Sequence, residues 1–253
     1  RPKIVGARVK RVDDPRLLIG GGSFADDRVT PNALHVAFRR SDHAHARIRH
    51  IDSAAACALP GIAAVFTGED LAAMVRPMVA TSRMKNYYAT PINVLARGKV
   101  RYVGEPVVAV LGENRYVAED ALDLLDIAFD PLGEVTDPEQ AIAAGAPLLH
   151  EEAGSNILVS REFRRGDVDA VLAAAPVRVG GRFRFRRKTP MALEARAYVA
   201  EYDRGRDLLT LTSSTQVPGI VRDALVELLD MPGHSVRVVA QDVGGGFGGK
   251  TSL

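Results

Sequence analysis

The sequence predicts an α+β protein of two domains. Short apolar runs typical of buried strands alternate with short helical segments between residues 33 and 129. A strand, a helix and a second strand follow one another between residues 207 and 240. A stretch rich in proline, alanine and glycine at residues 136–147 separates the two regions. We therefore predict domains at residues 1–135 and 136–253.

Composition narrows the function classes. The chain has 253 residues, of which 47% are hydrophobic and 25% charged, as in an ordinary globular protein. Its formal net charge of +2 gives no field that would attract nucleic acid. The single cysteine, Cys57, excludes an internal disulfide and an all-cysteine metal site. No apolar stretch approaches the roughly 20 residues that span a bilayer. We expect a cytoplasmic protein, and because no initiator methionine is present, a fragment is one alternative.

The strands and helices of the first domain can be assigned in order along the chain. The apolar runs at its strands are bounded by turn residues, and its helices carry apolar faces or acidic first turns. Cys57 on an alanine-rich helix is expected to be a buried small hydrophobic residue. We predict strands at residues 33–39, 62–66, 107–111 and 127–129, helices at 52–57, from 67 and at 116–125, and a long loop at 72–98.

In the second domain we predict strands at residues 177–187, 198–202, 207–213 and 236–240 and a helix at 219–230. The strand–helix–strand order makes the last two strands parallel, with a right-handed crossover. Gln216 and the glycine-rich loop then both leave carboxyl ends of neighbouring strands, where ligands bind.

One predicted strand of this domain has a second interpretation. The run at residues 182–188, which overlaps the end of this strand, places aromatic residues between basic ones, as some nucleic-acid binders do. Its strict alternation is also what a half-buried strand needs, with Phe183 and Phe185 facing inward. We favour the strand and, after it, a contact between subunits.

The loop at residues 242–250 (DVGGGFGGK) places five glycines around one phenylalanine. Residues 244–249 satisfy the dinucleotide pattern G-x-G-x-x-G, but the helix and the later acid that this fold needs do not follow. Residues 244–251 satisfy the phosphate-loop pattern, with Lys250 as phosphate-binding cation and Thr251 as magnesium ligand. Most of the chain precedes this loop, whereas a phosphate loop usually opens its domain. A purely structural turn is the third alternative.

The loop also resembles the pterin-binding loop of the molybdenum hydroxylases, the family of xanthine dehydrogenase, aldehyde oxidase and aerobic carbon monoxide dehydrogenase. The resemblance implies an α/β hammerhead domain, followed by the first part of a molybdopterin-binding α/β domain that contains the strand–helix–strand unit. Further segments similar to the family, in the same order, are residues 9–20, 24–27, 40–48, 59–62, 66–70, 102–107, 149–152, Asn156, 166–167 and 213–216.

The resemblance implies a cofactor site. The family's counterpart of Gln216 donates a hydrogen bond to an axial oxygen ligand of molybdenum. Backbone at the positions of Gly245, Gly246 and Gly248 lies against the molybdopterin, and the ring at Phe247 sits beside the metal and substrate. No residue of this chain is implied to bind the metal directly. The glutamate that serves as general base lies beyond the loop, outside the sequence, so no catalytic residue is implied here.

The resemblance further implies an oxidoreductase that hydroxylates an electron-poor carbon, in an aldehyde or an N-heteroaromatic ring. Its cofactor is molybdopterin, with the cytosine dinucleotide form as one option. FAD and [2Fe-2S] clusters belong to partner subunits, and a carboxy-terminal half of the molybdenum subunit is a further partner. Thr251 stands where purine-oxidising members carry glutamate, which disfavours purines. The alternatives are a non-catalytic scaffold subunit and a phosphate-loop nucleotide-binding protein.

Two other features invite a functional interpretation. His43 and His45, with His35 and His50 nearby, suggest a metal cluster, but no cysteine or carboxylate partner is in register, and packing is favoured. Glu194 is expected either to shape the substrate side of the pocket or to form a structural salt bridge.

Overall fold

The structure is a computed structural model that describes residues 4–80, 82 and 84–251. The outermost residues of the two predicted domains, 1–3 and 252–253, lie outside the described residues. The chain forms two compact units, Asn32–Arg186 and a second that joins Arg1–Pro31 to Arg187–Leu253. The domain boundary between residues 135 and 136 stays a prediction.

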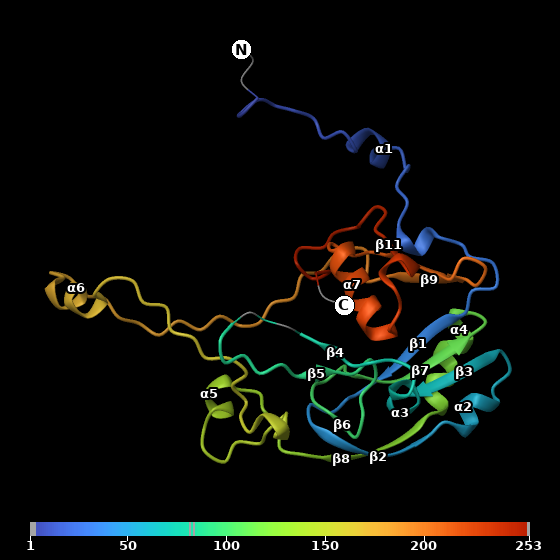
Figure 1. The fold of residues 1–253 in the computed structure, drawn as a ribbon, viewed down its shortest axis with the longest axis horizontal. Coiled ribbons are helices and arrows are strands. Elements are labelled where there is room, and N and C mark those ends of the chain that lie inside the picture. Colours follow the sequence, from blue (N-terminus) through green and yellow to red (C-terminus); the bar gives the residue numbers. More distant parts are fainter. Residues whose placement is uncertain (1–3, 81, 83, 252–253) are drawn as a thin grey trace. The chain divides into compact units, whose positions relative to one another are not determined.

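The unit Asn32–Arg186 is built on two three-stranded sheets (Figure 1). The strand order is β1–β7–β3 in one sheet and β6–β2–β8 in the other, and all pairs are antiparallel. The elements are β1 (His35–Arg40), β2 (Ala46–Asp52), α2 (Ala54–Ala58), β3 (Ile62–Thr67), α3 (Gly68–Ala72), β4 (Met78–Val79), β5 (Pro91–Ile92), β6 (Lys99–Val100), β7 (Pro106–Gly112), α4 (Arg115–Asp120), a 3-10 helix (Ala121–Leu124), β8 (Asp126–Pro131), α5 (Pro138–Ala141), a 3-10 helix (Glu151–Ala153) and α6 (Val168–Ala174).

The core of this unit surrounds the central strand β7. Val107, Val108 and Val110 are fully buried, as the continuous apolar run of the sequence predicts for a strand covered on both faces. Burying each such side chain contributes about 1.5–3 kcal/mol. Ala46 of β2 and Val100 of β6 belong to the same cluster, so the core joins the two sheets.

Local signals fix the helix ends around β7. Thr67 is the N-cap of α3, where its hydroxyl accepts from the Asp70 N–H and the Asp70 carboxylate accepts from the Thr67 N–H. The hydrogen bonds from the Thr67 side chain and backbone lower the pKa of Asp70. Asn114 caps α4 through the Val117 N–H. These contacts confirm the helix start predicted at residue 67 and the helix predicted from residue 116, which begins at Arg115.

The strand predicted at residues 177–187 is wrong for this chain. The segment has no strand neighbour among the described residues, and its backbone makes no ladder hydrogen bond there. Phe183 and Phe185 are 85% and 94% exposed instead of facing inward. A half-buried strand needs alternating residues and also a neighbouring strand with which its backbone can pair. The segment has the alternation but lacks the neighbouring strand among the described residues.

Two smaller expectations also fail in this unit. Cys57 is exposed, because the short helix α2 buries only Ala56. β2 was not predicted from the sequence, and its pairing with β8 shifts between Ile48 and His50. That shift breaks the alternation of inward and outward residues from which a strand is predicted.

The second unit contains one three-stranded sheet in the order β11–β10–β9. β10 pairs antiparallel with β9 and parallel with β11, and α7 connects the parallel pair. The predicted strand–helix–strand unit is therefore confirmed (Figure 1). None of the helices among the described residues has the length and hydropathy needed to cross a bilayer. The elements are α1 (Asp14–Leu18), a 3-10 helix (Ala25–Asp27), β9 (Tyr198–Asp203), β10 (Leu208–Ser213), α7 (Pro218–Leu229), a 3-10 helix (Gly233–Ser235) and β11 (Val236–Val239).

Candidate functional site

Gln216 and the glycine-rich loop meet at the carboxyl ends of β10 and β11, as the parallel pairing requires. The Gln216 side-chain oxygen accepts from the N–H groups of Gly248 at 3.1 Å and Lys250 at 3.3 Å. The backbone N–H of Gln216 donates to the Lys250 carbonyl at 3.0 Å. A Cβ added to Gly246 would lie 2.4 Å from the Gln216 side-chain carbonyl carbon, so any other residue there would require Gln216 to move. The predicted proximity of Gln216 and the loop is confirmed.

These bonds orient the Gln216 amide. Two backbone donors converge on one end of the group, and only the amide oxygen can accept both hydrogen bonds. The NH₂ end donates to none of the described residues. Gln216 therefore presents a neutral donor beside the loop.

The loop itself offers a row of backbone donors. The N–H groups of Gly245, Gly246 and Phe247 make no hydrogen bond to a described residue, whereas those of Gly244, Gly248, Gly249 and Lys250 are used inside the unit. Gly245 and Gly248 have φ values of +101° and +83°, which glycine adopts without strain. Phe247 has φ +48° and a side chain that is 76% exposed. Three successive free N–H groups between glycines favour contact with an electron-rich ligand.

Lys250 and Glu194 form a buried ion pair behind the loop. The ammonium lies 2.7 Å from Glu194 Oε2, and the two side chains are only 4% and 11% exposed. The same oxygen accepts from the Gly244 N–H at 2.7 Å. Of the two roles expected for Glu194, the structure shows the salt bridge.

This ion pair argues against the phosphate-loop interpretation. A phosphate-binding lysine points into the mouth of its loop, whereas Lys250 is buried and paired with a carboxylate. The Thr251 hydroxyl, the expected magnesium ligand, donates to the Gly248 carbonyl at 2.7 Å. Both groups that the nucleotide would need are engaged within the protein.

Asp242, at the entrance of the loop, is held by the amino-terminal segment. Both Asp242 oxygens accept from the Arg16 guanidinium at 2.7 Å, and one also accepts from the Ser23 N–H at 2.8 Å. The Asp242 N–H donates to the Ser23 carbonyl at 3.1 Å. The Arg16 hydrogen bonds, and after them the Ser23 N–H, hold the pKa of Asp242 well below its usual range. No local sequence pattern indicates this contact, because Arg16 and Asp242 are 226 residues apart.

We expect Asp242→Asn to lower stability at neutral pH and to lose that effect in acid. A carboxylate with a depressed folded-state pKa stabilises the fold above its unfolded value, near pH 4, and this contribution is lost as the pH falls through the folded pKa. The measurement is the unfolding midpoint of both proteins from about pH 7 to about pH 2. Asp223→Asn, in an exposed pair with Arg222, is the control. A difference that stays constant down to pH 2 would contradict the assignment.

The histidine pair serves packing in the described structure. His45 Nδ1 lies 2.8 Å from the Gly133 carbonyl, and its Nε2 lies 3.3 Å from the buried Lys99 ammonium. The His43 ring packs against Phe129, with 5.0 Å between ring centroids. Among residues 4–80, 82 and 84–251, no three His, Cys, Asp or Glu side chains converge to hold a metal.

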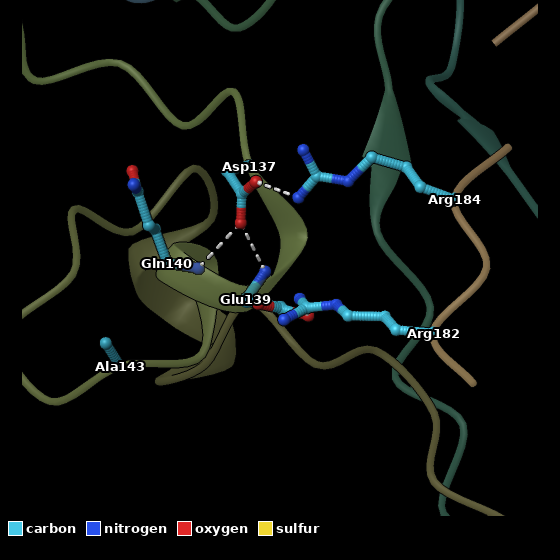
Figure 2. A pocket seen from close by; sticks show the side chains of 6 residues that line it. All are labelled: Asp137, Glu139, Gln140, Ala143, Arg182 and Arg184. Atoms are coloured by element: carbon cyan, nitrogen blue, oxygen red, sulfur yellow. Dashed lines mark hydrogen bonds and ion pairs between the residues drawn. The ribbon is translucent and has the colours of Figure 1, made fainter. Parts of the chain in front are cut away.

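A hollow beside α5 is lined by ion pairs (Figure 2). Arg184 lies 3.4 Å from Asp137, and Arg182 pairs with Glu139. Asp137 also caps α5 by accepting from two backbone N–H groups, which lowers its pKa. Because each arginine already faces a carboxylate, this hollow offers no unneutralised cation to an anionic ligand.

Comparison with protein families assigns both parts of the chain. Residues 19–133 match the aldehyde oxidase and xanthine dehydrogenase a/b hammerhead domain. Residues 149–253, which contain Gln216 and the glycine-rich loop, match the molybdopterin cofactor-binding domain.

Individual relatives cover the whole chain. It is 36% identical to the nicotine 6-hydroxylase large subunit of Paenarthrobacter nicotinovorans, over 99% of this chain and 30% of that protein. It is also 36% identical to the carbon monoxide dehydrogenase large chain of Afipia carboxidovorans, over 97% of this chain and 31% of that protein. The structure of quinoline 2-oxidoreductase from Pseudomonas putida 86 matches 99% of this chain and 32% of its own, with a TM-score of 0.92 and 36% identity. The chain thus spans about a third of the length of these relatives.

Proposed function

Because this chain belongs to the molybdenum hydroxylase family, as an amino-terminal portion of the large subunit, we propose that it supplies one wall of a molybdopterin site. Residues 136–253 would form the first part of the cofactor domain. Gln216, Gly245, Gly246, Phe247 and Gly248 would line it, without a direct metal ligand among them.

The main support for the proposal is the hydrogen bonding of Gln216. Its side-chain oxygen accepts from two N–H groups of the loop, while its NH₂ group donates to none of the described residues. A large anionic cofactor requires hydrogen-bond donors and close approach of the backbone, and this edge provides both. The three free N–H groups at residues 245–247 add to the Gln216 donor. Bound there, the cofactor would supply the oxidation chemistry at molybdenum, while the chain's own groups bind and orient it.

We infer that the complete enzyme hydroxylates an electron-poor carbon, of the N-heteroaromatic or aldehyde type. Relatives named for nicotine and quinoline oxidation support the N-heteroaromatic class. Thr251 stands at the position where purine-oxidising members carry an acid, and its hydroxyl is occupied by the Gly248 carbonyl. A purine substrate is therefore disfavoured.

We propose the remaining partners from the family. The general-base glutamate would come from the part of the large subunit that this chain does not span, because the chain covers about a third of its relatives. The exposed Phe183 and Phe185 support contact with that part of the subunit, since exposed large apolar side chains that cluster mark interaction surfaces. Subunits carrying FAD and [2Fe-2S] clusters would accept the electrons, and the complex would work in the cytoplasm. The pterin would take either its simple or its cytosine dinucleotide form.

Purification with and without the polypeptide encoded downstream tests the proposal. We expect stoichiometric molybdenum and pterin in the complex and none in the isolated chain. A complex that forms but holds neither would favour the scaffold alternative. Nucleotide protection of the loop against proteolysis, with no metal in either preparation, would overturn the cofactor site.

A further inference from the structure

We propose that Glu194 is the residue that positions the glycine-rich loop for its ligand, an inference that rests on the cofactor site proposed above. One carboxylate oxygen, Oε2, accepts from the Gly244 N–H and from the Lys250 ammonium, each at 2.7 Å. Gly244 opens the glycine run and Lys250 closes it. A single atom therefore holds both ends of the loop.

The backbone around Glu194 holds the same loop end. The Glu194 N–H donates to the Gly244 carbonyl at 3.2 Å. A Cβ on Gly244 would lie 2.5 Å from the Glu194 Cβ, so the two segments touch without room for a side chain. Glu194 thus contacts Gly244 through its backbone N–H, its Cβ and its carboxylate.

The geometry favours positioning over mere stabilisation. The other carboxylate oxygen, Oε1, is buried and has no hydrogen-bond partner among the described residues. Such an oxygen costs free energy that a well-packed apolar pair would not. The arrangement instead holds one oxygen where the two ends of the loop converge.

Glu194 reaches the ligand side through Lys250. The Lys250 N–H donates to Gln216 Oε1, and the Lys250 carbonyl accepts from the Gln216 N–H. Fixing the Lys250 ammonium therefore fixes the backbone that orients the Gln216 amide. The free Gln216 NH₂ group and the free N–H groups at residues 245–247 keep their direction as long as this chain of contacts holds.

Hydrogen exchange on the complex, prepared from cofactor-deficient cells, tests this role. In Glu194→Gln we expect the Gly248 and Lys250 amides to exchange at least about tenfold faster, because a buried ammonium loses its partner. The amides of β10 should keep the wild-type rate. Glu201→Gln, which removes a carboxylate from the partly exposed pair with Arg28 in the same unit, should change neither.

A double variant keeps the test decisive if Glu194→Gln fails to fold. Glu194→Gln with Lys250→Met leaves no unpaired buried charge, so we expect the sheet to recover while the loop amides stay fast. Unchanged loop exchange in both variants would overturn the proposal. A parallel rise in the loop and in β10 would also overturn it, because that result indicates general destabilisation.

Cofactor content separates this proposal from the function on which it rests. In complex from cofactor-replete cells, Glu194→Gln should hold about tenfold less pterin than wild type, and Glu201→Gln as much as wild type. Wild-type complex without pterin would defeat the proposed function, while the exchange data would still decide the role of Glu194.

Discussion

Gly246→Ala is expected to disorder the loop and to remove cofactor retention together. The new Cβ would lie 2.4 Å from Cδ and 2.5 Å from Oε1 of Gln216, well inside contact distance. Gln216 cannot swing away freely, because its oxygen holds the Gly248 and Lys250 N–H groups. Overpacking costs about 1–3 kcal/mol, and each lost hydrogen bond adds about 0.5–1.5 kcal/mol. Pterin content of the purified complex should therefore fall by more than about tenfold.

Gly219→Ala is the matched control for this substitution. Gly219 lies in the first turn of α7, and a Cβ there meets nothing within 4 Å. Alanine at that position should stabilise the helix by up to about 1 kcal/mol and leave pterin content unchanged. Equal pterin content in Gly246→Ala and wild type would contradict the placement of Gln216 against the loop.

The parts of the fold predicted from sequence are those with local causes. The run at residues 107–111 predicts the central strand β7, because a strand buried on both faces needs continuous apolar residues. Thr67 and Asp70 predict the start of α3, since their side chains cap it within one turn. The strand–helix–strand order predicts that Gln216 and the loop share one edge, because the crossover forces a parallel pair.

The parts that the sequence could not show depend on distant partners. Glu194 and Lys250 are 56 residues apart, and Arg16 and Asp242 are 226 apart, so no local pattern links either pair. The roles of the five candidate site residues in binding the cofactor remain predictions, because those roles depend on a ligand and on further polypeptide.

The segment at residues 177–187 also depends on distant partners, but here a local pattern is present and the partner is missing among the described residues. Alternation in a sequence indicates which residues would share a face if the segment were a strand. Whether a strand forms depends on a neighbouring edge, which no described residue provides. Periodicity alone therefore predicts correctly neither the burial of Phe183 and Phe185 nor the pairing of this segment.

Phe183→Ser with Phe185→Ser is expected to weaken assembly with the remaining polypeptide by about a hundredfold or more. Both rings are at least 85% exposed, and they stand two residues apart, as side chains that share a face of an extended chain do. Burying a phenylalanine contributes about 1.5–3 kcal/mol, so two rings account for at least about two decades of affinity. The backbone of this segment makes no ladder hydrogen bond to the part of the chain that the structure describes, and an edge strand of the partner would satisfy such groups. Co-purification yield and a titration of the two purified polypeptides measure the loss.

Two controls distinguish a specific interface at Phe183 and Phe185 from nonspecific association of exposed apolar residues. Tyr116→Ser removes an aromatic ring that is 73% exposed on α4, outside the segment, and should leave assembly unchanged. Phe185→Tyr keeps a ring and should retain most of the affinity, because the apolar area survives. If the double serine variant assembles as tightly as wild type, the exposed rings do not form the interface. If Tyr116→Ser weakens assembly to the same extent, exposed apolar area anywhere on the unit is enough to promote assembly. That result would contradict a specific role of residues 177–187 as a strand that pairs with the partner.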